Sequence, residues 1–144
     1  MSIQNFENHA RIDTGYHRIL SPILLLTFIG SGVNLYHSLG DHQRLYSASL
    51  IAVILASLIA VALYARIFAL KAQDRAIRAE ENLRHYVLTG KLLDSRLTLR
   101  QIVALRFASD AEFPGLAAQA AAAGTDAKEI KRAVTHWRAD EDRV

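Results

Sequence analysis

Two long apolar runs follow one another in the first half of the chain. Residues 45–65 are twenty-one positions without a charge, and residues 19–40 form a second charge-free run directly before them. At a rise of about 1.5 Å per residue, such a helix is just long enough to cross the ~30 Å hydrocarbon core of a bilayer. The pattern therefore predicts two transmembrane helices, over residues 19–40 and 45–66, joined by a short outer loop over residues 41–44.

The first run has a clear helix start. Ser21 is a good N-cap, and Pro22 suits the first helical position, where its missing N–H costs no hydrogen bond. A buried core helix or a cleaved signal peptide would also be apolar, although Glu7 and Asp13 stand in the segment before the run. The second run beside it favours the membrane interpretation, because two such runs form a hairpin.

Basic residues set the expected orientation of this hairpin. They gather outside the two runs, at Arg11 and Arg18 before the first run and at Arg66, Lys71, Arg75, Arg78 and Arg84 after the second. The connecting loop has Arg44 alone. The positive-inside rule therefore predicts that both termini are cytoplasmic and that residues 1–18 form an N-terminal cytoplasmic segment.

Small residues mark the expected contact faces of the two spans. In the second span they recur every four residues, at Ala48, Ala52, Ala56 and Ala60. In the first span, a small and polar stripe contains Thr27, Gly30, Ser31 and Asn34. Such faces let two helix backbones approach closely in lipid, either within the hairpin or between copies of the chain. We expect Asn34 to hydrogen-bond to the partner helix.

Beyond Arg66 the helical pattern continues, which predicts a cytoplasmic helical stalk over residues 67–89. Apolar residues there follow alternating three- and four-residue steps, at Ala69, Ala72, Ala76, Ala79, Leu83 and Tyr86. This spacing is typical of a coiled-coil seam, and the seam could face a partner, the tail or solvent. The second span is therefore expected to run on as one long helix.

Three shorter helices are expected in the tail, residues 90–144. Gly90 ends the stalk, and Thr98 with Gln101 forms a capping box that opens a helix to about Ala108. Ser109 or Asp110 begins the second helix, which tolerates Pro114 near its first turn and ends at Gly124, and Asp126 caps the third. The apolar stripe of the third helix contains Ile130, Ala133, Val134 and Trp137. The predicted fold is all-α: a transmembrane hairpin, a long helical extension and a small three-helix tail.

Composition removes several kinds of chemistry. The chain has no cysteine, so disulfides, thiolate metal sites and cysteine nucleophiles are excluded. No glycine-rich phosphate loop, G-x-S-x-G elbow or H-E-x-x-H helix is present, and no pair of catalytic carboxylates is evident. We therefore expect no enzyme activity, no catalytic residue, no cofactor and no small-molecule substrate.

Two residue clusters suggest alternative functions. The third tail helix carries a basic face, composed of Lys128, Lys131, Arg132 and Arg138. A membrane-anchored regulator could use this face on nucleic acid or anionic lipid, but nine basic and eight acidic residues from Gly90 onward give little attraction for nucleic acid. His9, Asp13 and His17 recur at four-residue spacing and could bind a divalent metal in a metal-responsive sensor, although no fourth ligand stands nearby.

The chain resembles an uncharacterised family of short bacterial two-span membrane proteins, a domain of unknown function. The similar segments are residues 4–9 (QNFENH), 16–17 (YH), 31–36 (SGVNLY), 66–78 (RIFALKAQDRAIR), 105–108 (LRFA), 130–133 (IKRA) and 137–140 (WRAD). The resemblance implies a hairpin in the bacterial cytoplasmic membrane and a helical tail, but it brings no substrate, cofactor or catalytic residue. We expect a non-catalytic structural or assembly component that contacts itself or another membrane protein through its alanine faces and the stalk seam.

Overall fold

The structure is a computed structural model, and it describes residues 5–7 and 13–139. Its elements are a π-helical turn η1 (Gly15–Leu20) and the α-helices α1 (Ser21–His37), α2 (His42–Thr89), α3 (Leu99–Leu105), α4 (Phe113–Ala123) and α5 (Ala127–Ala133). The expected all-α fold is therefore confirmed. The chain divides into two compact units: the first covers Ile12–Ala69, and the second combines Met1–Arg11 with Leu70–Val144.

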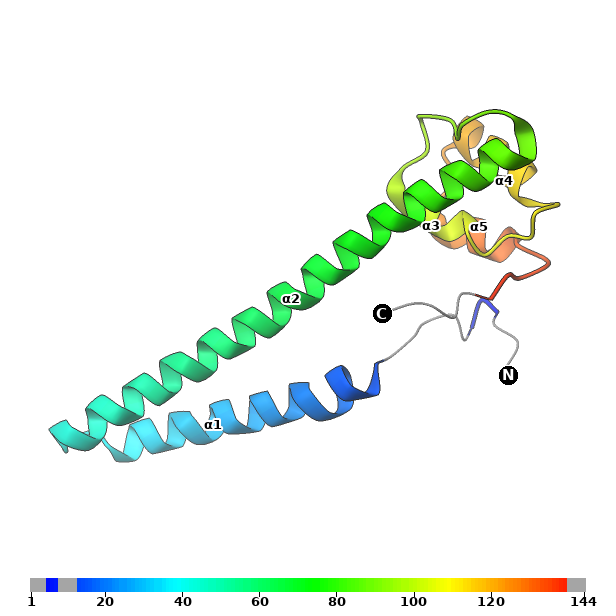
Figure 1. Cartoon of the computed structure of the whole chain (residues 1–144). Helices are drawn as coiled ribbons and strands as arrows, with labels where there is room; N and C mark the ends of the chain where they lie inside the picture. Colours follow the sequence, from blue (N-terminus) through cyan, green and yellow to red (C-terminus); the bar gives the residue numbers. More distant parts are fainter. Residues whose placement is uncertain (1–4, 8–12, 140–144) are drawn as a thin grey trace. The chain divides into compact units, whose positions relative to one another are not determined.

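In the first unit, α1 and the first half of α2 form an antiparallel hairpin (Figure 1). Gly40 makes the turn between them with a φ of 111°, in the left-handed region that glycine adopts without a steric penalty. The Asp41 carboxylate then accepts hydrogen bonds from the backbone N–H groups of Gln43 (3.1 Å) and Arg44 (3.2 Å). This cap satisfies donors that the start of a helix leaves without partners, so α2 begins directly after the turn.

Helix α2 has 48 residues and continues through Arg66 without a break. The expectation of one long helix is thus confirmed, because nothing in the sequence on either side of Arg66 interrupts helical hydrogen bonding. The helix ends at Thr89, where Gly90 takes a φ of 74° and its N–H donates to the carbonyl of Tyr86 (2.8 Å). Glycine at this position allows the left-handed turn that ends many helices.

Local capping signals position the helices of the second unit. The predicted capping box is present: Gln101 N–H donates to Thr98 Oγ1 (3.3 Å), and Thr98 N–H donates to Gln101 Oε1 (2.8 Å). Gln101 Nε2 also donates to the carbonyl of Thr125 (2.8 Å), which connects α3 to the loop before α5. Gly124 closes α4 with a φ of 64°, and the Asp126 side chain caps α5, as the sequence predicts.

The bounds of all three tail helices differ in part from the sequence prediction. Helix α4 begins at Phe113 instead of at Ser109 or Asp110, because residues 110–112 form a turn. Helix α3 ends at Leu105, short of the expected Ala108, and α5 ends at Ala133, so Trp137 is not part of its apolar stripe. Trp137 instead lies in an extended segment that pairs with Ala108 in an antiparallel bridge. Its ring packs 4.9 Å from the Phe107 ring, centroid to centroid. This tertiary contact outweighs the helical periodicity of the local sequence.

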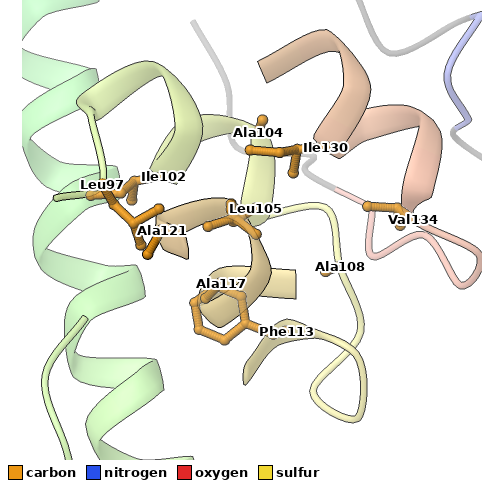
Figure 2. Packing of buried hydrophobic residues seen from close by; sticks show 11 residues of the cluster. Leu97, Ile102, Ala104, Leu105, Ala108, Phe113, Ala117, Ala121, Ile130 and Val134 are labelled. Carbon is orange, nitrogen blue, oxygen red and sulfur yellow. The ribbon is translucent and has the colours of Figure 1, made fainter. Parts of the chain in front are cut away.

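A hydrophobic core holds α3, α4 and α5 together (Figure 2). Leu105 at the end of α3 and Phe113 at the start of α4 are completely buried, and Ala117 packs in the same cluster. Ile130 brings α5 into this cluster. The second unit therefore buries its own apolar side chains, in contrast to the hairpin.

Candidate functional site

The hairpin exposes most of its large apolar side chains. Both apolar helical stretches, Gly15–His37 and the one in His42–Thr89, are long and apolar enough to cross a membrane by length and composition, and only 6% of each apolar window is buried. Leu26 is 67% exposed and Val61 62% exposed, for example. Apolar surface of this extent is typical of contact with lipid or another protein rather than with water.

The contact between α1 and α2 involves only part of the alanine face predicted on α2. One row of buried or half-buried positions of α2 follows three- and four-residue steps: Leu45, Ala48, Ala52, Leu55, Ile59, Ala62 and Arg66. Ala48 is 1% exposed and Ala52 half-buried, whereas Ala56 is exposed and Ala60 is half-buried. A four-residue step turns about 40° beyond a full helical turn, so Ala56 no longer lies on the same face as Ala48.

The stripe predicted on α1 is only partly in contact with α2. Ser31 is buried, but Thr27, Gly30 and Asn34 are exposed. The expected hydrogen bond from the Asn34 side chain to α2 is absent from the described residues, so that prediction is wrong. Ser38, one turn further on, is the buried polar residue at this end, and its hydroxyl donates to the Asn34 carbonyl (2.8 Å).

The stalk seam lies on the side of α2 that faces away from the tail. Ala69 is half-buried, and the other members, Ala72, Ala76, Ala79, Leu83 and Tyr86, are all exposed. The opposite face of the helix carries Ile77 and Glu81, which are 8% and 6% exposed. Of the three partners that the sequence leaves open for the seam, the tail is thus excluded within the described residues.

Arg84 joins α2 to the tail through a cluster of short contacts. Its Nη1 donates to Glu81 Oε2 (2.9 Å), its Nη2 donates to the carbonyl of Ala108 (2.7 Å), and its Nε donates to Asp110 Oδ1 (2.7 Å). The guanidinium also lies 4.5 Å from the centroid of the Phe113 ring. Only 11% of the Arg84 side chain and 7% of the Glu81 side chain are exposed, so this ion pair is largely shielded from water.

A polar hollow of about 590 Å³ opens beside this cluster. It is lined by Glu80, Glu81, Arg84, Ser109, Asp110, His136, Trp137 and Arg138. Glu81 lies between the two guanidinium groups, with its Oε1 3.8 Å from Arg138 Nη1. Most charges in the wall therefore neutralise one another, and no hydrogen bond joins the side chains of Ser109 and His136 within the described residues.

The four residues of the predicted basic face lie in different surroundings. Lys131 Nζ lies 5.5 Å from the centroid of the Phe107 ring, and the Arg132 guanidinium lies 5.4 Å from that of Phe6. Arg138 is beyond the end of α5 and approaches Glu81, while Lys128 is exposed in the first turn. A helix of seven residues with its cations dispersed in this way gives little support to nucleic-acid recognition.

The predicted metal ligands are only partly within the described residues. His9 lies outside them. The Asp13 carboxylate accepts a hydrogen bond from the Tyr16 N–H (2.6 Å), and His17 Nδ1 lies 3.1 Å from the Asp13 backbone carbonyl instead of its carboxylate. Within residues 5–7 and 13–139, no group of three or more histidine, aspartate or glutamate side chains is arranged to hold a metal ion.

Glu112 holds the segment that follows α5. Its carboxylate accepts hydrogen bonds from the hydroxyl and the N–H of Thr135 and from the N–H of His136 (3.1 Å), and it lies 2.6 Å from His136 Nδ1. The Thr135 hydroxyl bond, with the bonds from His136 and the Thr135 N–H, keeps the pKa of Glu112 below its ordinary value of 4.5, although partial burial opposes this. These bonds favour the ionised carboxylate in the folded unit.

The Glu112→Gln variant is expected to remove part of the acid sensitivity of the second unit. A folded-state pKa below the unfolded value means that the stabilisation is present above pH 4.5 and is lost as the pH falls through the folded-state pKa. The chain has a single tryptophan, Trp137, next to this segment. Its fluorescence during acid titration should therefore change less in the variant than in the wild type, and identical titrations would contradict this role of Glu112.

Sequence reasoning missed the two sites that the tertiary structure assembles. One is the Arg84 cluster, where Glu81 and Arg84 stand three residues apart opposite the stalk seam, a spacing that could have indicated their shared face. The other joins Tyr16 to α2: its hydroxyl donates to the Ala62 carbonyl (3.1 Å). The sequence carries no local signal for that second contact, because 46 residues separate its partners.

Comparison with known proteins identifies one family. Residues 1–144 match a family described as a family of unknown function, DUF6526. No curated protein matches the chain. No solved structure matches it either.

Proposed function

The chain belongs to this family of unknown function, and from that premise we propose that it is a non-catalytic multi-pass protein of the bacterial cytoplasmic membrane that acts through helix–helix contacts. The observation that carries the proposal is the contrast between its two units. The second unit has a closed hydrophobic core, whereas the hairpin exposes apolar side chains along both helices. Exposing apolar area to water costs about 25 cal/mol per Å², so the hairpin requires a lipid environment.

The charge distribution supports an orientation with both termini in the cytoplasm. Arg66 and the basic residues that follow it lie beyond the apolar part of α2, whereas the turn between α1 and α2 carries one arginine. That arginine, Arg44, already pairs with Asp41 at 3.2 Å. Positively charged segments are retained on the cytoplasmic side, which places the turn outside.

The exposed stalk seam supports association between two copies of the chain. Copies that insert with the same orientation have parallel stalks, and the seam then occupies the a and d positions of a heptad. Arg75 and Glu80 flank the seam and are exposed, and neither forms an ion pair with another described residue. In a parallel pair, Arg75 of one copy lies opposite Glu80 of the other, because g and e positions five residues apart face each other.

Single-cysteine variants provide a test of the orientation, since the chain has no cysteine of its own. Gln43→Cys lies at the turn, and Ser95→Cys lies in the loop before α3; both positions are exposed. In intact inverted membrane vesicles, a membrane-impermeant maleimide should label the Ser95→Cys variant and leave the Gln43→Cys variant unlabelled until detergent is added. Equal labelling of both variants, or release of the protein by alkaline carbonate, would refute the membrane proposal.

Oxidative cross-linking of the same membranes tests the association. Ala79→Cys places a thiol in the seam, and Arg78→Cys places one on the adjoining outer surface; both wild-type residues are exposed. We expect a disulfide-linked dimer for Ala79→Cys and little for Arg78→Cys, because only seam positions of parallel helices come close enough to bond. Equal yields, or no dimer from either variant, would show that the seam does not join two copies.

A further inference from the structure

A narrow apolar groove separates η1 and α1 from α2, at the end of the hairpin remote from its turn. Its volume is about 200 Å³, and its apolar wall is formed by Leu20, Leu24, Leu25, Ile59, Ala62 and Leu63. This volume is below the roughly 300–1,000 Å³ that is typical of pockets for drug-sized molecules. Part of one acyl chain fits this space, whereas a whole phospholipid does not.

The polar groups of the groove wall are already satisfied. The Tyr16 hydroxyl donates to the Ala62 carbonyl across the groove (3.1 Å), and the Ser21 hydroxyl donates to the Tyr16 carbonyl (2.8 Å). Both residues line the groove, and each already donates its hydroxyl proton, so neither offers a free donor to a polar occupant. Tyr16 lies on the π-helical turn η1, a geometry that is rare in proteins and frequently occurs at functional sites.

A positive charge stands at one end of this apolar surface. The Arg66 guanidinium lies 5.7 Å from the centroid of the Tyr16 ring, and Arg66 is half-buried. It forms no ion pair with a carboxylate among the described residues, and the carboxylate of Asp13, the acidic residue nearest in sequence to Tyr16, accepts a hydrogen bond from the Tyr16 N–H (2.6 Å). Arg66 is also the first charged residue after the apolar run of α2, at the level where lipid headgroups would lie.

We infer that this groove binds one acyl chain of an anionic phospholipid, with its phosphate group held by Arg66. The inference rests on the proposed insertion of the hairpin in a membrane. Any membrane would fill an apolar groove with hydrocarbon, so the distinguishing feature is the uncompensated arginine beside it. The positive charge of Arg66 attracts an anionic headgroup and adds no net attraction for a headgroup without net charge.

Native mass spectrometry of the full-length protein in mild detergent tests this inference, with phosphatidylglycerol and phosphatidylcholine as probes. Wild-type protein should retain phosphatidylglycerol preferentially. Arg66→Gln should lower that preference about fivefold, which corresponds to the attraction of one basic residue near an anionic surface. Arg44→Gln removes the same charge at the other end of the hairpin and should leave the preference unchanged.

A second pair of variants tests the groove itself. Ala62→Leu fills the groove and should reduce retention of both lipids, whereas Val61→Leu adds similar bulk on the neighbouring exposed position and should not. Circular dichroism should show unchanged helix content in all four variants. An effect of Arg66→Gln without one of Ala62→Leu would indicate surface attraction alone and would overturn the proposed site.

The outcomes also separate this inference from the proposed function. A protein that resists carbonate extraction yet retains neither lipid, or retains both equally, would refute the lipid site and leave the membrane proposal intact. A protein that carbonate releases would refute the membrane proposal itself. Equal effects of Ala62→Leu and Val61→Leu would show that the lipid binds the outer surface rather than the groove.

Discussion

Replacing Arg84 with methionine is expected to lower the free energy of unfolding of the second unit by about 3–5 kcal/mol. The substitution removes the partner of Glu81, whose side chain is only 7% exposed, and leaves a shielded carboxylate without its cation. The carbonyl of Ala108 loses its bond from the guanidinium as well. Urea unfolding of the full chain in detergent, followed by fluorescence of its single tryptophan, Trp137, measures the change.

A double variant separates the ion pair from the packing around it. Adding Glu81→Leu to Arg84→Met replaces both charges with apolar groups, which is often neutral at buried positions. We expect the double variant to recover most of the lost stability. If the double variant is as unstable as Arg84→Met alone, the loss of stability comes from the contacts of Arg84 with Ala108 and Phe113 rather than from the unpaired Glu81 carboxylate.

The second large effect is expected for Phe113→Ala, at about 3–5 kcal/mol of unfolding free energy. Phe113 is completely buried at the start of α4, and its ring contacts His85 edge to face at 5.7 Å between centroids. The Arg84 guanidinium covers the same ring. Truncation therefore leaves a cavity between α2 and α4 and removes the ring that the Arg84 guanidinium covers. Urea unfolding followed by Trp137 fluorescence measures this loss of unfolding free energy.

Leu92→Ala is the matched control for this core substitution. Leu92 lies in the loop after α2 and is 64% exposed, so its truncation should change the unfolding free energy by less than about 0.5 kcal/mol. If Leu92→Ala lowered the unfolding free energy as much as Phe113→Ala, burial would not explain the stability of this unit. Because Phe113 and Arg84 are in contact, their substitutions combined should not be additive.

Local sequence signals correctly predicted four of the helix boundaries of this protein. The apolar runs predicted two long helices, and Gly90, Gly124, the Thr98 capping box and Asp126 marked helix ends that the structure confirms. Each of these signals acts within a few residues, through backbone geometry or a nearby hydrogen bond. Such short-range effects can be read from sequence because their partners are fixed by their spacing along the chain.

Tertiary structure decided which face of each helix is used. The four-residue spacing predicted that the alanines of α2 form one contact face. Each four-residue step rotates the position by about 40°, however, so Ala48 is buried and Ala56 is exposed, and contact with α1 decides which of the two is buried. The helical pattern continued to Trp137, yet contact with Phe107 and the bridge to Ala108 take that residue out of α5. The contacts of Arg84 with Asp110 and of Tyr16 with Ala62 join residues far apart in the chain. No local pattern encodes such pairs, because packing creates them only when distant elements meet.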